Sequence, residues 1–114
     1  MVADVCEIPV RFYARGDVSV LRLVDESGYR DSPAALTVNA VSAYLAQHSG
    51  LVDAWLGYSS DKRVLSGWYF TERSADKFVV GYLGNHPNGG EFTFSDRIRA
   101  CAEFIIREVR WIAE

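Results

Sequence analysis

The side chains that could carry out catalysis are few, and they lie far apart in the sequence. Two histidines, His48 and His86, and two cysteines, Cys6 and Cys101, occur in 114 residues. His86 lies in a loop of Gly, Pro and Asn residues and could act as a general base, but no spacing identifies a partner for it. His48 falls on the apolar side of a predicted helix, where a histidine belongs more often to the core edge than to a ligand set.

Motifs for metal, phosphate or nucleophile chemistry are absent from the sequence. The Cys and His residues have no metal-ligand spacing, and no GxGxxG, P-loop, GxSxG or HExxH motif occurs. The two cysteines are interpreted as structural, because a cytoplasmic protein keeps its thiols reduced and a free cysteine behaves as a small hydrophobic residue. We therefore expect no metal, no cofactor and no catalytic activity.

The charge distribution raises the possibility of an acidic surface. The chain has 12 basic and 15 acidic side chains, a net charge of −3, which argues against a nucleic-acid binder that works through bulk charge. The segment 31–61 contains Asp31, Asp53 and Asp61 but no Lys or Arg, so it accounts for the whole imbalance. This segment is either a half-buried helical region with few charges or an acidic docking face for a basic partner.

Aromatic and basic residues alternate around the first predicted hairpin, a pattern that can bind single-stranded nucleic acid. They are Lys62, Arg63, Trp68, Tyr69, Arg73 and Lys77. Glu72 and Asp76 lie in the same turn and cancel much of the positive field, which favours a core sheet with a solvated turn instead. With Trp55 and Tyr58 nearby, the same surface would also suit a protein partner, because Trp, Tyr and Arg dominate interface energetics.

Length and composition indicate a single domain over residues 1–114. Apolar residues make up 49% of the chain and charged residues 24%, which is typical of a folded core. The longest uncharged run, 32–52, is too polar to span a membrane, and the first residues lack the basic and apolar regions of a secretory signal. We expect a soluble, cytoplasmic protein that folds without metal or disulfide.

The first half of the chain is expected to be mainly helical. Ile8–Tyr13 has an extended pattern, whereas Val18–Ser27 fits a short helix or, less well, a hairpin strand. Ser32-Pro33 predicts the start of a helix that ends at Gly50. A second short helix follows and is expected to stop near Gly57.

The second half is predicted to form three strands and a long helix. From Val64 the hydrophobic period changes from near 3.6 to 2, and further strands are expected over Lys77–Leu83 and Glu91–Phe94. Ser95 is expected to cap a helix whose apolar stripe comprises Ile98, Cys101, Ala102, Ile105, Val109 and Ile112. The fold class is therefore α+β: N-terminal helices, a three-stranded antiparallel meander and a C-terminal amphipathic helix packed on the sheet.

Two segments resemble a known family. Residues 51–63, LVDAWLGYSSDKR, with SGWYF at 66–70, and the C-terminal segment ACAEFIIRE at 100–108 are similar to immunity proteins of bacterial contact-dependent growth inhibition systems. The likeness covers roughly residues 19–110. It consists of similar short stretches of sequence and a similar order of helices and strands, and it includes no fixed set of binding positions.

The resemblance implies a cytoplasmic protein that binds the C-terminal toxin domain delivered by a neighbouring cell, often a nuclease such as a tRNase, and that has no catalysis of its own. The residues hypothesised to contact the toxin are Asp53, Asp61, Glu72 and Asp76, as phosphate mimics, together with Trp55 and Tyr58. One alternative is a small ligand-binding domain or enzyme with a pocket between sheet and helix near His86. Another is a nucleic-acid binder that uses the hairpin near Arg63 and Arg73.

Overall fold

The computed structural model describes residues 1–62, 67–85, 87 and 89–114 of the chain. The helices that precede the sheet are α1 (Val2–Cys6), α2 (Ile8–Arg15), α3 (Val20–Glu26), α4 (Val38–Gln47) and α5 (Gly50–Asp61), with short 3-10 helices at Tyr29–Asp31 and Pro33–Ala35. The strands are β1 (Gly67–Ser74), β2 (Lys77–Leu83) and β3 (Glu91–Phe94), and the last helix is α6 (Arg97–Ala113). The predicted α+β class is confirmed.

The prediction of an extended segment over Ile8–Tyr13 is wrong, because these residues lie in α2. Pro9 occupies the first turn of this helix, where its missing N–H costs nothing. Gly16 ends the helix at φ +70, a left-handed conformation that glycine adopts without strain, and its N–H donates to the Phe12 carbonyl oxygen. Helix α3 confirms the helical alternative for Val18–Ser27, and the Ser19 side chain accepts the Arg22 N–H at its start.

Three of the predicted helix boundaries are wrong. Helix α4 begins after Thr37, whose hydroxyl caps it, and Pro33 opens a separate 3-10 turn. Gly50 is the first residue of α5 instead of the end of α4, and α5 continues through Gly57 to Asp61. A helical glycine costs about 1 kcal/mol relative to alanine, and the burial of Tyr58 one residue further on outweighs this cost.

The sheet has the strand order β1-β2-β3, with both pairs antiparallel, so the predicted meander is confirmed. The predicted start of the first strand at Val64 lies outside the described residues. Trp68 and Phe70 point toward the core and are almost fully buried, as the alternation in the sequence predicts. Trp68 is opposite Tyr82 on β2, and Val80 is opposite Phe92 on β3.

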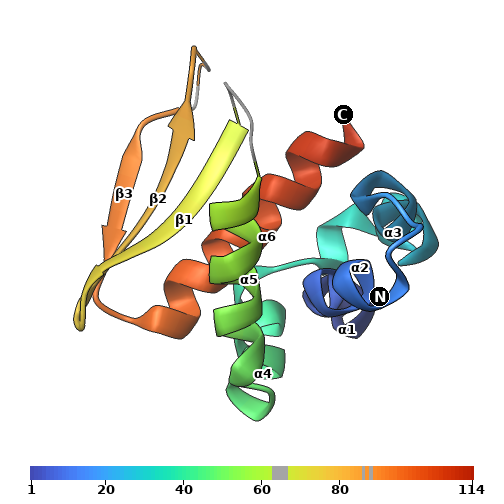
Figure 1. Cartoon of the computed structure of the whole chain (residues 1–114), viewed down its shortest axis with the longest axis horizontal. Helices are drawn as coiled ribbons and strands as arrows, with labels where there is room; N and C mark the ends of the chain where they lie inside the picture. The colour runs from blue at the N-terminus through green and yellow to red at the C-terminus, as the bar shows by residue number, and fades with distance from the viewer. Residues whose placement is uncertain (63–66, 86, 88) are drawn as a thin grey trace.

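Helix α6 lies between the sheet and the N-terminal helices (Figure 1) and contacts all three strands as well as α3 and α4. Asp96, and not the predicted Ser95, caps it by accepting the N–H groups of Ile98 and Arg99. On the surface of this helix Glu103 forms ion pairs with Arg99 and Arg107, with closest N–O distances of 3.5 and 3.7 Å. None of the described helices is long and apolar enough to cross a membrane.

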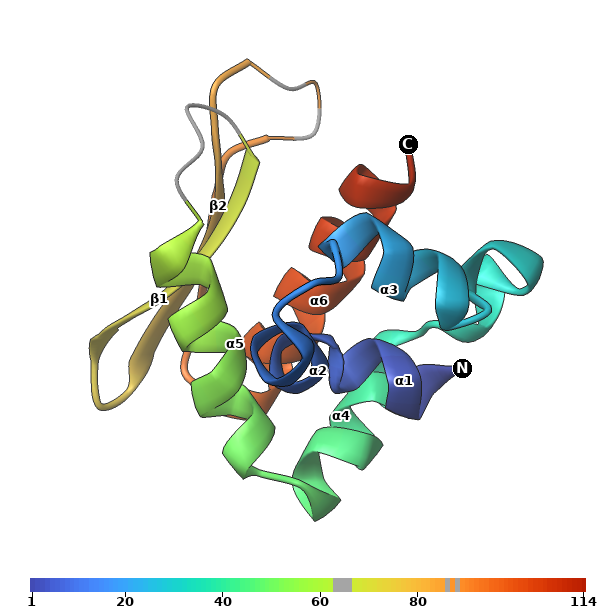
Figure 2. The same cartoon turned by 45° about the vertical axis from the view of Figure 1, so that its right-hand side comes forward.

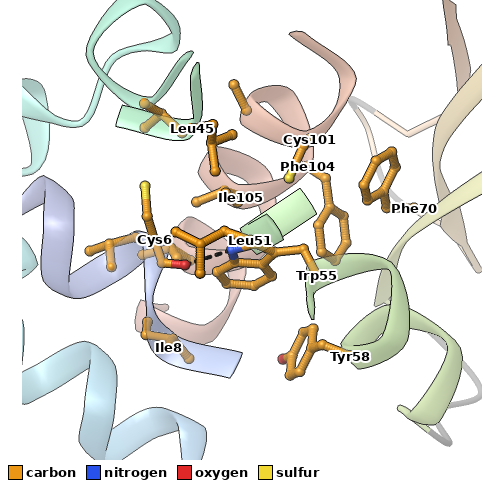
Figure 3. Packing of buried hydrophobic residues seen from close by; sticks show 14 of the residues in the cluster. Cys6, Ile8, Leu45, Leu51, Trp55, Tyr58, Phe70, Cys101, Phe104 and Ile105 are labelled. Atoms are coloured by element: carbon orange, nitrogen blue, oxygen red, sulfur yellow. Dashed lines mark hydrogen bonds between the residues drawn. The ribbon is translucent and has the colours of Figure 1, made fainter. Parts of the chain in front are cut away.

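The core is centred on aromatic rings from α5, β1 and α6 (Figure 3). The centroid of the Phe104 ring lies 5.9 Å from that of Trp55 and 5.7 Å from that of Phe70. Phe104 is fully buried, although it is not among the residues of the predicted apolar stripe. These contacts fix α5 against α6 and the sheet, and thereby position the residues of the site described next.

Candidate functional site

A pocket of about 550 Å³ lies where α2, α3, α5 and α6 meet. These helices lie beside one another in Figure 2. The apolar part of the lining consists of Phe12, Val20, Leu21, Trp111 and Ile112. The polar part consists of Tyr13, Tyr58, Asp61, Lys62 and Glu108. Its volume is within the range that small-molecule and side-chain binding sites usually have.

A buried carboxylate, Glu108, forms the inner end of the polar lining. Its side chain is 1% exposed and accepts three hydrogen bonds. The Tyr58 hydroxyl donates to Oε2 at 2.6 Å, and the Lys62 ammonium donates to Oε1 at 2.8 Å and to Oε2 at 2.7 Å. The ammonium also donates to the Trp68 carbonyl oxygen at 2.8 Å. This buried charge is therefore both paired and hydrogen-bonded, as a stable interior requires.

Aromatic rings complete the surroundings of the Lys62 ammonium. Its nitrogen lies 5.8 Å from the ring centroid of Tyr58, 5.9 Å from that of Phe104 and 5.5 Å from that of Trp111. Such distances permit cation–π attraction. Burial, followed by the negative charge of Glu108 and the hydrogen bond to it, raises the pKa of Tyr58 far above its ordinary value. Tyr58 therefore keeps its proton and donates a hydrogen bond to Glu108, which holds Tyr58, Lys62 and Glu108 in one arrangement.

The outer part of the pocket lining is exposed, and among the described residues it contains one carboxylate, that of Asp61. The Tyr13 hydroxyl donates to Asp61 Oδ2 at 2.7 Å, although Tyr13 itself is 53% exposed. This hydrogen bond, with smaller effects of burial and of the carboxylate charge, raises the pKa of Tyr13 to about 12. Leu21, on α3, is 48% exposed. The pocket therefore presents apolar and aromatic surface beside an accessible acid.

The two aromatic residues predicted as toxin contacts lie in the interior. Trp55 is 1% exposed, and its indole N–H donates to the Cys6 carbonyl oxygen at 2.9 Å (Figure 3). Trp55 therefore offers no surface to a partner in this structure; its large apolar ring is used in the core. Tyr58 is 7% exposed and contributes to the pocket lining through the hydroxyl that Glu108 accepts.

The four carboxylates predicted as toxin contacts are not on one surface. Asp53, in the first turn of α5, forms an ion pair with Arg97 at the start of α6. Glu72 and Asp76 lie at the β1–β2 turn, which Figure 1 shows at the opposite end of the sheet from the end of α5. Asp61, at that end of α5, lines the pocket. Asp61 is thus the member of this set that the structure places beside apolar binding surface.

The described basic and aromatic residues of the first hairpin are divided between the interior and a charge-balanced surface, on which Tyr69 and Arg73 both bind Glu91. Trp68 is 4% exposed, and the Lys62 side chain is 9% exposed because it binds Glu108. Arg73 forms a bidentate pair with Glu91, at 3.2 and 3.0 Å. Arg63 lies outside the described residues. The described part of this hairpin therefore supports the core-sheet interpretation rather than a nucleic-acid platform.

The predicted alternative of a pocket near His86 involves a residue outside the described part of the chain. The pocket that the structure describes lies instead between helices and has no strand residue among its lining. His48 stacks on Tyr44, with ring centroids 4.3 Å apart. Within the described ranges, no group of three or more His, Cys, Asp or Glu residues is placed to hold a metal ion.

The two cysteines are free and buried. Burial, with a smaller effect of Glu7, raises the pKa of Cys6 to about 12, and burial likewise raises the pKa of Cys101. Because the thiolate is the reactive form, both thiols should react with Ellman's reagent roughly 100-fold more slowly in the folded protein than in denaturant at mildly alkaline pH. Equal rates in the two conditions would show that at least one thiol is accessible in the folded state.

Comparisons with known protein families, with curated proteins and with solved structures find no significant match to this chain. A function therefore has to be inferred from the pocket, the charges and the sequence resemblance.

Proposed function

We propose that this chain is an immunity protein, which neutralises a cognate toxin domain in the cytoplasm by binding it stoichiometrically. The observation that carries the proposal is the open pocket, whose exposed lining combines Tyr13, Leu21 and the carboxylate of Asp61. Apolar and aromatic pockets beside a charged group are typical anchor sites of protein interfaces. The sequence resemblance to immunity proteins points to a toxin as the partner.

The bonding within the pocket supports binding rather than catalysis. Lys62 and Glu108 neutralise each other at 2.7 Å, and Tyr58 donates to the same carboxylate. An amine held in this way is not available as a nucleophile or base, and the raised pKa of Tyr58 opposes proton release. These groups therefore serve to stabilise the pocket wall.

The surface around the pocket also favours a macromolecular partner. Val10 is 47% exposed and lies three residues before Tyr13 on α2, so the two side chains extend the apolar surface on the same side of that helix. A standard interface buries about 1,600 Å² in total, which is enough to cover this helix face and the pocket together. The net charge of −3 favours a basic partner, such as the nuclease toxins that the resemblance implies.

The direct test uses the gene that lies next to this one. An immunity protein should be encoded beside a large secreted protein, and the C-terminal domain of that protein should arrest growth when it is expressed alone. Coexpression of this chain should restore growth, and the purified pair should form a one-to-one complex. The absence of such a gene, or growth arrest that this chain does not relieve, would contradict the proposal.

A matched pair of leucines tests whether the pocket is the contact surface. Leu21→Lys places a positive charge in the apolar lining, where it repels a basic partner, and should weaken toxin binding about 10- to 100-fold. Leu83→Lys makes the same change on a leucine of β2 that is about equally exposed and lies outside the pocket lining, and it should leave affinity unchanged. Isothermal titration calorimetry measures both. Equal affinities for the two variants would exclude the pocket.

A small-molecule binding function is the second candidate, because the pocket volume falls in the usual range of about 300–1,000 Å³ for such sites. Native mass spectrometry of the purified protein distinguishes the two functions. A bound organic molecule that copurifies with the wild type but not with Leu21→Lys would favour the small-molecule alternative.

A further inference from the structure

Asp61 is the pocket carboxylate whose charge no described cation balances. The described charged groups of the lining are two carboxylates, Asp61 and Glu108, and one ammonium, that of Lys62, which gives a net charge of −1. Lys62 is fully used by Glu108, with N–O distances of 2.8 and 2.7 Å. Among the residues that the structure describes, Asp61 accepts a hydrogen bond only from the neutral Tyr13 hydroxyl.

The carboxylate oxygens of Asp61 can accept further hydrogen bonds, and the residues around them suit a cation with an apolar stem. An ionised carboxylate has about four lone-pair sites, and the Tyr13 hydroxyl uses one of them. Asp61 and Leu21 are exposed, and Trp111 is half-buried beside them in the lining. A long basic side chain fits such a site, since its methylene groups cover apolar surface while its charged end stays with the acid.

The pocket already accommodates one cation in this way. The Lys62 ammonium lies between Glu108 and the rings of Tyr58, Phe104 and Trp111, on the buried side of the pocket. Because Glu108 neutralises it, Lys62 adds little repulsion toward a second cation at Asp61. An acidic side chain would instead meet the unbalanced charge of Asp61 directly, so charge complementarity selects a basic occupant.

We propose that this pocket receives an arginine side chain presented by the toxin domain, with its guanidinium on Asp61 and its stem against Leu21 and Trp111. Arginine fits better than lysine because its planar fork can donate two parallel hydrogen bonds to one carboxylate and stack on aromatic rings. This inference rests on the proposed function and specifies the chemistry of the contact.

Asp61→Asn tests the ion pair, because it removes the charge and keeps an oxygen that the Tyr13 hydroxyl can use. Toxin affinity should fall about 10- to 100-fold and should depend less on salt than in the wild type. The control is Asp31→Asn, which makes the same change in net charge on an exposed residue outside the pocket lining. The control should bind within about twofold of the wild type.

A double-mutant cycle identifies the partner residue. Each arginine of the toxin domain is changed to Gln, and one of these variants should show no further loss of affinity when combined with Asp61→Asn. The inference is wrong if the effect of every toxin arginine variant adds to that of Asp61→Asn, or if Asp61→Asn binds the toxin domain as tightly as Asp31→Asn does. The proposed function still stands in either case if the wild-type protein neutralises the toxin.

A probe that needs no toxin separates the two proposals. N-acetyl-arginine amide is titrated into the free protein while the indole N–H resonance of Trp111 is followed by NMR. A saturable shift that Asp61→Asn abolishes and that N-acetyl-norleucine amide does not produce supports a guanidinium site, even if the toxin test fails. The absence of any shift at Trp111 would overturn the inference.

Discussion

Lys62→Met is expected to lower the free energy of unfolding by about 3–5 kcal/mol, the usual cost of removing one partner from a buried ion pair. The reason is the position of Glu108, which is 1% exposed and would keep Tyr58 as its remaining side-chain partner. Lys62 supplies the described ion pair of Glu108, so the substitution leaves this buried carboxylate without a countercharge. Urea denaturation near neutral pH, followed by tryptophan fluorescence, measures the change.

A double-mutant cycle separates the ion pair from simple loss of packing. Glu108→Gln keeps an oxygen acceptor for the Tyr58 hydroxyl, so Lys62→Met combined with Glu108→Gln should recover most of the stability that Lys62→Met alone loses. Arg22→Met breaks an exposed pair with Glu26 and should cost no more than about 1 kcal/mol. If Lys62→Met costs as little as Arg22→Met, the buried cluster does not stabilise the fold.

The sheet could be predicted from the sequence because its signals are local. Alternation of apolar residues sets which face of a strand is buried, and the turn residues on either side set its length. The predicted bounds of Lys77–Leu83 and Glu91–Phe94 agree with the structure, and short connections leave antiparallel pairing as the simple outcome. Burial of Trp68 and Phe70 follows from the same alternation.

The helix boundaries are harder to predict from the sequence than the strands, because tertiary packing overrides local propensity. Gly57 is a weak helix former, but Trp55 and Tyr58 on either side of it are buried, and this requires the helix to continue. The segment Ile8–Tyr13 is too short to show whether its apolar residues repeat with the strand period of 2 or the helix period of 3.6. Its packing against other helices, which the sequence does not reveal, determines that it forms α2.

The pocket could be predicted only in part. Asp61 was among the predicted contacts and does lie in it, but Lys62 and Glu108 are 46 residues apart and no local pattern shows that they meet. A signal was present: Glu108 follows Phe104 by four residues, so a helix buries both on one face. An acid on an apolar helix face indicates a buried partner, and the chain folds Lys62 onto it.

Trp55→Ala is the second change with a large expected effect, and it tests the corrected position of this residue. Removal of a fully buried tryptophan should lower the free energy of unfolding by about 3–5 kcal/mol. Trp55→Phe retains most of the apolar volume but leaves the Cys6 carbonyl oxygen without its donor, so it should cost a smaller amount, about 1–3 kcal/mol. Chemical denaturation measures both variants.

Trp111 provides the matched comparison, because it is half-buried and lines the pocket. If Trp55 belongs to the core and Trp111 to the binding surface, the two substitutions should have opposite profiles. Trp55→Phe should lose stability yet bind the toxin domain with unchanged affinity under conditions where it is folded. Trp111→Ala should lose affinity by about 10-fold or more, because aromatic anchors dominate interface energies. Normal binding by Trp111→Ala together with weak binding by folded Trp55→Phe would restore Trp55 as a contact residue and would require a conformational change that exposes it.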